Sequence, residues 1–449
     1  MEFYFWVIKS YIMEFKIAFT DKEISAWGGM VFMKKLIEKC EVLEILKGLD
    51  MPTQGSNRGY SPLQLIQAFW ISVWCGANRF MHLDVLRMDA TLQKLFGWKR
   101  MAGHKAFQRY FDKFNTASNH QVFHNLYQWF FGQLQFDNYT LDLDSTVLTR
   151  YGNQQGATRG HNSKKPGRKS HHPLMAFVAD CRMVANFWLR SGNAAVVNNF
   201  EGFLLDTLDK LRNKTIGLLR ADSGFYCKEV FNLLESHSIQ YIIAAQMYPA
   251  LQKIIVSQHN WMPLNIAIDI TSVQYHSPLW TSARRVVIVR QKIEERPNAT
   301  GVSLQLFKDD EIIRGYRYSA FVTNLTLPDK EIWLLYRNRA DAENRIKELK
   351  EDFALQSFCM QNFNATETAL NWVMVAYNLM SLFRVAVLKT TVHPQLKTLR
   401  YKIFAVPSYI TKNGNQRTLN MAVAMKRRKW FDGLFSTLEE LKMPYAVFA

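Results

Sequence analysis

The stretch Tyr139-Thr140-Leu141-Asp142-Leu143-Asp144-Ser145-Thr146-Val147 alternates between polar and apolar residues and predicts a β-strand. This alternation puts the two aspartates on one face and the two leucines on the other. A carboxylate within an apolar strand is costly unless it is paired or bound to a cation. For Asp142 we favour a strand edge that faces solvent. For Asp144 this stretch supports solvent exposure and a functional role equally.

The segments that follow this strand predict an α/β core. Strand-like runs cover residues 173–180, 183–190, 215–221 and 239–245, and helical runs cover 200–211 and 226–236. A basic, glycine-containing loop is expected over residues 151–170. The order is three strands, helix, strand, helix, strand, as in a ribonuclease-H-like fold, where short crossovers add parallel strands. We therefore expect a ribonuclease-H-like catalytic core.

The chain has 449 residues, which suggests two or three domains. Residues 1–132 are expected to form a helical N-terminal domain, and DNA-end binding or simple packing on the core would suit it equally. The core begins at 133–246, is interrupted by a β-rich insertion at 247–326, and resumes at 327–390. Within the insertion, strands are expected at 284–290, 303–307 and 316–322, with a turn at Pro297-Asn298. A basic, helical C-terminal region is expected over 391–449.

The composition favours a polyanionic partner. The net charge is +18, and the pI is near 9.6. The five cysteines are scattered without a Cys-x-x-Cys pair, which argues against a zinc ribbon or a disulfide framework. Residues 1–15 are too short and too charged to span a bilayer, and Met13 is an alternative start. We expect no apolar run of membrane length, no membrane partner and a cytoplasmic, nucleoid-associated protein.

Two further acidic residues occur in informative positions. Asp222 follows the strand-like run 215–221 and precedes a turn and a helix, which is where open α/β sheets place their sites. A helix cap is the competing interpretation for this residue. Glu343 lies in a predicted helix that also contains Tyr336, Arg339 and Lys350. Counted from Tyr336, the residues Arg339, Glu343 and Lys350 lie 3, 7 and 14 positions further along the chain. At about 100° per residue, these four side chains share one stripe roughly 60° wide.

Together the three carboxylates predict one metal site. Asp144 and Asp222 fall on the first and fourth strands of the expected core, and a helix packed at the sheet edge could add Glu343. Hard oxygen donors suit Mg²⁺ or Mn²⁺ and do not suit zinc. Two such ions, about 3.5–4 Å apart, would serve an in-line phosphoryl displacement. Beside them, Arg339 and Lys350 could donate charge-assisted hydrogen bonds to phosphate oxygens.

At these blocks the sequence resembles a known family. Leu-Asp-Leu-Asp-Ser-Thr-Val at 141–147, Arg-Ala-Asp-Ser-Gly-Phe-Tyr at 220–226 and Tyr336-x2-Arg339-x3-Glu343-x6-Lys350 look like the three blocks of DDE transposases from bacterial insertion sequences. The match is to the branch with the Tyr-Arg-Glu-Lys signature. The stretches at 151–152, 160–162, 164–168 and 171–174 also resemble DDE domain group 1.

The resemblance implies a set of roles. Asp144, Asp222 and Glu343 would be the metal-binding catalytic triad, holding two Mg²⁺ ions for which Mn²⁺ can substitute. Tyr336, Arg339 and Lys350 would contact the phosphates of the transposon end. The expected activity is cleavage and strand transfer at inverted-repeat ends by cut-and-paste transposition. Double-stranded DNA would be the partner of a homodimer. A tryptophan of the insertion could stack on a flipped base, and Trp261 and Trp280 are candidates, although a core role is favoured for each.

Two other functions compete with this one. A DNA-binding protein derived from a transposase would bind ends without cutting, and a ribonuclease-H-like nuclease would cut without rejoining.

Several other polar residues have weaker predicted roles. Solvent or phosphate contact is favoured for His171 and His172, DNA contact or simple solvation for Lys164, Lys165, Arg168 and Lys169, a positional role for Arg190–Asn193, and a DNA patch or charged helix face for Lys426–Lys429.

Overall fold

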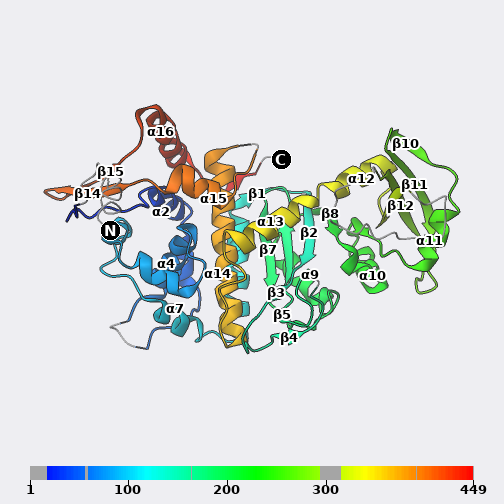
Figure 1. Cartoon of the computed structure of the whole chain (residues 1–449), viewed down its shortest axis with the longest axis horizontal. Helices are drawn as coiled ribbons and strands as arrows, with labels where there is room; N and C mark the ends of the chain where they lie inside the picture. Colours follow the sequence, from blue (N-terminus) through cyan, green and yellow to red (C-terminus); the bar gives the residue numbers. More distant parts are fainter. Residues whose placement is uncertain (1–17, 56–58, 163, 294–314, 391, 448–449) are drawn as a thin grey trace, which may run out of the picture.

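A nine-stranded mixed sheet is the central element of the fold (Figure 1). The computed structural model describes residues 18–55, 59–162, 164–293, 315–390 and 392–447. The sheet order is β10-β11-β12-β13-β9-β8-β2-β6-β7. Its core strands are β2 (Tyr139–Ser145), β6 (Leu174–Val178), β7 (Met183–Trp188), β8 (Ile216–Ala221) and β9 (Tyr241–Ala244). The protein is thus a mixed α/β protein, as predicted.

The core strands and helices follow the predicted order. Strand β2 pairs antiparallel with β6 and parallel with β8, and β8 pairs parallel with β9. The crossovers are α9 (Phe200–Lys210) and α10 (Lys228–Ser236). Leu141 and Leu143 are fully buried, so the apolar face of the opening strand faces the core. This arrangement brings the carboxyl ends of β2 and β8 to the same edge.

The β-rich segment 247–326 extends this same sheet. It contains α11 (Pro249–Val256), β10 (Met262–Asn265), β11 (Ile268–Tyr275), β12 (Arg284–Lys292) and β13 (Tyr316–Thr323). The strands predicted at 284–290 and 316–322 are confirmed, whereas the strand predicted at 303–307 and the turn at Pro297-Asn298 lie outside the described residues. Strand β13 pairs antiparallel with β9, with Val322 opposite Ile243. The segment is therefore joined to the core by backbone hydrogen bonds.

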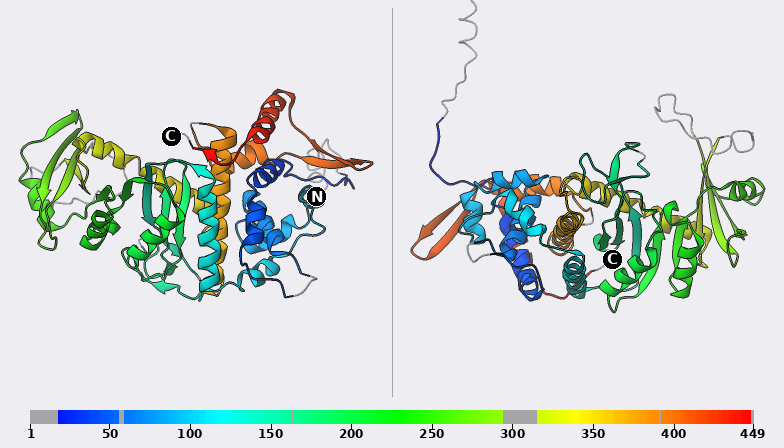
Figure 2. Two further views of the ribbon diagram at one scale, coloured as in Figure 1. Left: turned by 180° about the vertical axis from the view of Figure 1, so that it is seen from behind. Right: turned by 90° about the horizontal axis from the view of Figure 1, so that it is seen from below.

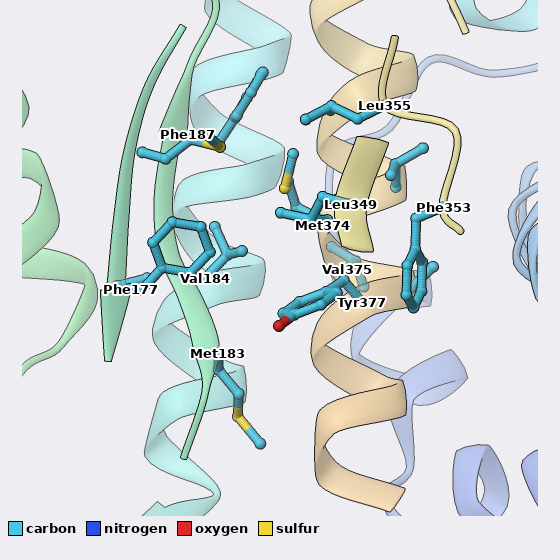
Figure 3. Close-up of a cluster of buried hydrophobic side chains, with 14 of the residues drawn as sticks. Phe177, Met183, Val184, Phe187, Leu349, Phe353, Leu355, Met374, Val375 and Tyr377 are labelled. Atoms are coloured by element: carbon cyan, nitrogen blue, oxygen red, sulfur yellow. The ribbon is translucent and has the colours of Figure 1, made fainter. Parts of the chain in front are cut away.

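A long apolar helix, α14 (Phe363–Leu382), packs against the other end of the sheet. Figure 3 shows Phe177, Val184 and Phe187 of the sheet beside Leu349, Met374 and Tyr377 of the helical layer. Among the described residues, the continuous helix Phe363–Leu388 is long and apolar enough to cross a membrane, and 94% of its apolar window is buried inside the protein. This length corrects our expectation that no apolar run reaches membrane length.

The N-terminal region is helical, as predicted. Its helices are α2 (Met30–Lys39), α3 (Val42–Gly48), α4 (Pro62–Trp74), α5 (Leu83–Leu86), α6 (Ala90–Phe96), α7 (His104–Phe111) and α8 (Thr116–Gly132). Ser61 caps α4 by accepting from the Gln64 amide. Helices α2 and α3 are separate because Glu41 adopts a left-handed conformation (φ 54°) between them.

The C-terminal region packs on the first helices, as Figures 1 and 2 show. It contains a hairpin of β14 (Ser408–Asn413) and β15 (Gln416–Met421), followed by α16 (Met425–Glu440). The rings of Phe32 and Phe435 stack with centroids 4.4 Å apart, and Ser25 forms a β-bridge with Ser408. The expected helices of the C-terminal region are present as α15 (Leu396–Leu399) and α16, and the hairpin of exposed polar strands is an addition that the expectation did not include.

Candidate active site

Asp144 and Asp222 lie at the same edge of the sheet on neighbouring parallel strands. Leu143 of β2 pairs with Ala221 of β8, so the next residue on each strand is one of the two aspartates. Asp222 caps the short 3-10 helix η2 (Ser223–Phe225) and accepts a hydrogen bond from the Gly224 amide at 3.0 Å. The capping interpretation is thus confirmed for Asp222, and it leaves the carboxylate beside the end of β2.

Arg339 pairs with Asp144 in a buried position. Its Nη2 donates to Asp144 Oδ2 at 2.8 Å and to the Leu143 carbonyl at 3.2 Å. Asp144 is 7% exposed and Arg339 is 4% exposed. A buried ion pair of this kind fixes the orientation of the carboxylate because both groups have lost solvent partners. Of the two interpretations that the sequence supported equally for Asp144, solvent exposure is therefore wrong.

The three carboxylates act electrostatically on one another. Burial raises the pKa of the Asp144 carboxyl to about 7, and the Arg339 guanidinium opposes that rise. The carboxylates of Asp222 and Glu343 add to it by like-charge repulsion. Excess negative charge in a buried site favours binding of a cation. With three hard oxygen donors, the residues fit Mg²⁺ or Mn²⁺.

Glu343 and Tyr336 reach the site from two helices. Tyr336 lies in the last turn of α12 (Asp329–Arg337), and Glu343 is exposed in the first turn of α13 (Ala340–Glu351). Burial raises the pKa of the Tyr336 hydroxyl, and the groups that act on it are those of the site: Arg339, Asp222, Asp144 and Glu343. The charges that act on the Tyr336 hydroxyl are therefore those of the predicted site residues.

The predicted single helix is, however, interrupted at Asn338 and Arg339. Arg220 Nη1 donates to the Leu335 carbonyl at 2.6 Å, which an unbroken helix would offer to the Arg339 amide. The Arg339 amide bonds instead to the Tyr336 carbonyl at 2.9 Å. A side chain that inserts into the helical hydrogen-bond ladder is a recognised cause of a kink. The break between α12 and α13 is therefore caused by Arg220, a residue of β8.

Lys350 lies in the last turn of α13 and points back to β2. Its Nζ donates to the Val147 carbonyl at 3.2 Å. Burial and the neighbouring Lys164 ammonium together lower the pKa of Lys350 to about 8. Lys164, an exposed cation of the basic loop, thus lies close enough to act on Lys350. That loop is not purely irregular, because β4 (Thr158–Arg159) and β5 (Lys169–His171) pair in it, and β5 also pairs with β3 (Leu148–Thr149).

Asp142 does not face solvent, so its favoured interpretation was wrong. It is 0% exposed and forms two hydrogen bonds with Arg220, to Nε at 2.7 Å and to Nη2 at 2.9 Å. Arg345 Nη1 of α13 lies 3.7 Å from Asp142 Oδ2, the oxygen that also accepts from Arg220 Nη2. Sequence reasoning missed both arginines. An arginine within the apolar run 215–221, opposite an aspartate on the neighbouring strand, was the available signal.

Other predicted contacts are structural. His171 and His172 are buried, at 0% and 8% exposure, so the expectation of solvent or phosphate contact was wrong. Arg190 donates to four backbone carbonyls, those of His172, Ala195, Val196 and Asn198, which agrees with a positional role.

Trp280 is a core residue, as favoured. Trp261 is half-buried, and the guanidinium carbon of Arg290 lies 4.3 Å from the centroid of its ring. Lys426–Lys429 lie in the first turn of α16.

Comparison with known proteins adds an independent line of information. The family model described as transposase DDE domain group 1 matches residues 11–443. A solved structure described as the cryo-EM structure of the piggyBac transposase synaptic complex with hairpin DNA is similar, with a TM-score of 0.46 and 11% sequence identity. That similarity covers 83% of this chain and 78% of that chain. The search of curated proteins gives no match. The family match spans every segment that contributes to the site.

Proposed function

The chain belongs to the transposase DDE domain group 1 family and is a DDE transposase, and on that premise we propose which reaction it performs and with which residues. The proposed reaction is cleavage and strand transfer at the inverted-repeat ends of an insertion sequence, by cut-and-paste transposition. The observation that supports the proposal is the pairing of Leu143 with Ala221, which puts Asp144 and Asp222 side by side at one edge of the sheet; the charges of Asp222 and Glu343 both raise the pKa of Asp144.

We propose that these three carboxylates hold two Mg²⁺ ions, or Mn²⁺ in their place. When bound, such ions polarise phosphoryl oxygens and stabilise the charge that develops in the transition state. Asp144 contributes an oriented carboxylate, because Arg339 holds one of its oxygens. Asp222 is held by the Gly224 amide, which leaves its second oxygen to face the site. Glu343 is exposed and can adjust when DNA and metal arrive.

Tyr336, Arg339 and Lys350 are the proposed DNA contacts. Tyr336 is half-buried and can donate to a phosphate oxygen, and Lys350 can do so with its ammonium. For Arg339, orientation of Asp144 is the first role that the geometry supports. Its Nε has no hydrogen-bond partner among the described residues but is buried, so a phosphate contact by Arg339 requires movement of the side chain. Fixed donors beside the scissile phosphate supply the positioning on which phosphoryl transfer depends.

The proposed architecture follows the predicted one. Strands β2, β6, β7, β8 and β9 would be a ribonuclease-H-like core, with strand order 3-2-1-4-5 in its own sequence numbering. Segment 247–326 would be its insertion, and residues 1–132 and 391–449 would flank it. A net charge of +18 supports a duplex DNA partner. Two ends must be held together in cut-and-paste transposition, so we propose a homodimer on DNA.

The reaction can be tested with labelled duplexes that carry the DNA on either side of the coding sequence. The purified protein is incubated with Mg²⁺, with Mn²⁺ or with EDTA, and a second plasmid serves as target. Metal-dependent cuts at the ends together with joined products are expected. Cuts without joined products would identify a nuclease instead. End binding without any cut would identify a DNA-binding protein derived from a transposase.

A further inference from the structure

A second group of potential metal ligands lies away from the acidic site, between helices α8 and α9. Within the described part of the chain, His120, His124 and Asp206 each place one ligand atom within 4.8 Å of the others. The two histidines are four residues apart on α8, so they share a helix face, and their rings stack with centroids 5.4 Å apart. Asp206 faces them from α9.

The distances fit a small ion held in the middle. His124 Nδ1 lies 3.1 Å from Asp206 Oδ1, and His120 Nε2 lies 3.8 Å from the same oxygen. Ligands about 2.0–2.1 Å from a tetrahedral Zn²⁺ lie roughly 3.3–3.4 Å from one another. The observed separations bracket this value. Two imidazoles with one carboxylate suit a borderline-soft ion, unlike the all-carboxylate set of the triad.

The second oxygen of Asp206 is already fully engaged. Asn186 Nδ2, Trp188 Nε1 and Lys210 Nζ all donate to Oδ2, at 2.9, 2.8 and 2.8 Å. The Lys210 ammonium therefore neutralises the oxygen that faces the interior. The oxygen that faces the histidines, Oδ1, is the one left to bind a cation. Metal-ligating carboxylates are commonly oriented by such second hydrogen bonds.

His124 is oriented in a similar way. Its Nε2 lies 2.9 Å from Asp209 Oδ2 and 2.7 Å from Gln128 Nε2. When the imidazole proton is on Nδ1, Nε2 accepts from Gln128 and Nδ1 donates to Asp206 Oδ1 at 3.1 Å. When the proton is on Nε2, His124 donates to the Asp209 carboxylate, and the lone pair of Nδ1 is directed at Asp206 Oδ1, where one cation can bind both atoms. A carboxylate behind a ligating histidine is the usual arrangement at zinc sites.

We propose that His120, His124 and Asp206 bind one Zn²⁺ ion, with water as the fourth ligand. The His120 side chain is 65% exposed, while those of His124 and Asp206 are 15% and 8% exposed. The site is therefore open to solvent on one side and anchored on the other. A bound ion links α8 of the N-terminal helical region to α9 of the core, which is a structural role independent of DNA cleavage.

The test is Zn²⁺ binding by the full-length protein after removal of metals with EDTA and exchange into metal-free buffer. Isothermal titration calorimetry should give one Zn²⁺ site that survives in Glu343→Gln, whose substitution lies in the acidic site. His120→Ala removes a mostly exposed ligand and should keep the fold. It should weaken Zn²⁺ binding by about tenfold or more, a loss that results even when a residue that only hydrogen-bonds a metal ligand is removed.

His237→Ala is the matched control, because His237 is an exposed histidine at the end of α10 and should leave Zn²⁺ affinity unchanged. A Co²⁺ titration provides a second readout, since a tetrahedral site gives strong visible absorption that His124→Ala should abolish. Equal Zn²⁺ affinity in the wild-type protein and His120→Ala would overturn the proposal. Binding that disappears only in Glu343→Gln would also overturn it, and would leave the cluster as an ion pair between His124 and Asp206.

Discussion

Arg339 donates from Nη2 to Asp144 Oδ2 at 2.8 Å, so a residue at the start of one helix orients a carboxylate on a central strand. Both side chains are buried, and the same nitrogen also reaches the Leu143 carbonyl. The pair ties the α12–α13 junction to the carboxyl edge of the sheet. Loss of either partner should disturb the position of Asp144 as well as the charge of the site.

Arg339→Lys tests this role in positioning. A lysine keeps the charge, but its ammonium on a flexible stem does not reproduce the fixed direction of the planar guanidinium, whose Nη2 bonds both Asp144 and the Leu143 carbonyl. We expect DNA cleavage to fall by about 10²-fold, the loss that a misplaced catalytic group can produce. End binding should weaken much less, because net charge is unchanged. Cleavage rates under single-turnover conditions, alongside binding to the same duplex, check this. An unchanged cleavage rate would contradict the proposed orientation of Asp144.

Arg220→Met should destabilise the protein and displace the site. The substitution leaves Asp142 buried without its main partner, a change that typically costs about 3–5 kcal/mol. It also frees the Leu335 carbonyl to bond the Arg339 amide, which would straighten the α12–α13 junction. Urea unfolding should report the loss of stability. Arg317→Met, at an exposed arginine of β13 in the same sheet, is the control and should change stability by less than about 0.5 kcal/mol.

A buried histidine should make stability depend on pH. Burial, together with the nearby Arg150 guanidinium, lowers the pKa of His171 to about 4 from an ordinary 6.5. His171 is neutral in the fold, accepting from Arg150 at Nδ1 and facing the Gln155 carbonyl at Nε2. Between about pH 6.5 and 4 the unfolded chain binds a proton that the folded chain does not. Stability should therefore fall as pH falls through this window, by up to about 3 kcal/mol.

The contribution of His171 is isolated by comparison with His171→Gln. His393 has a pKa lowered to about 4 as well, but it is present in both proteins. The difference in unfolding free energy between the two proteins should shrink as pH falls from 6.5 to 4. A difference that stays constant over that range would show that His171 is not held neutral.

Lys350 should contribute to DNA affinity through charge. Its ammonium lies at the site beside β2, whereas Lys347 on the same helix is exposed. Lys350→Met should weaken end binding and reduce the slope of log affinity against log salt by about 1. Lys347→Met removes the same charge from α13 at an exposed position and serves as control. Equal effects of the two substitutions would argue against a specific phosphate contact at Lys350.

Local patterns allowed most of the core to be predicted. Alternation in residues 139–147 gave β2, and the spacing of apolar runs gave the order of strands and helices. The position of Asp144 and Asp222 at one sheet edge followed from that order, because adjacent parallel strands bring their ends together. These features depend on short-range periodicity, which the sequence carries directly.

The features that escaped prediction depend on contacts between distant residues. Asp142 looked like a solvent-facing residue because its partners, Arg220 and Arg345, come from another strand and a helix. The break between α12 and α13 depends on Arg220 capturing the Leu335 carbonyl, more than a hundred positions away in the chain. The continuation of the sheet into β13 and the C-terminal hairpin are also matters of pairing rather than of local pattern.

The most direct test of the acidic site compares Glu343→Gln with Glu351→Gln. Both residues are exposed glutamates on α13, and each substitution replaces a carboxylate with an amide of similar size. Mg²⁺-dependent cleavage of the end duplex should be lost in Glu343→Gln while DNA binding persists, and Glu351→Gln should cleave normally. Asp144→Asn and Asp222→Asn should behave like Glu343→Gln. Normal cleavage by Glu343→Gln would contradict the assignment of the three carboxylates to one catalytic site.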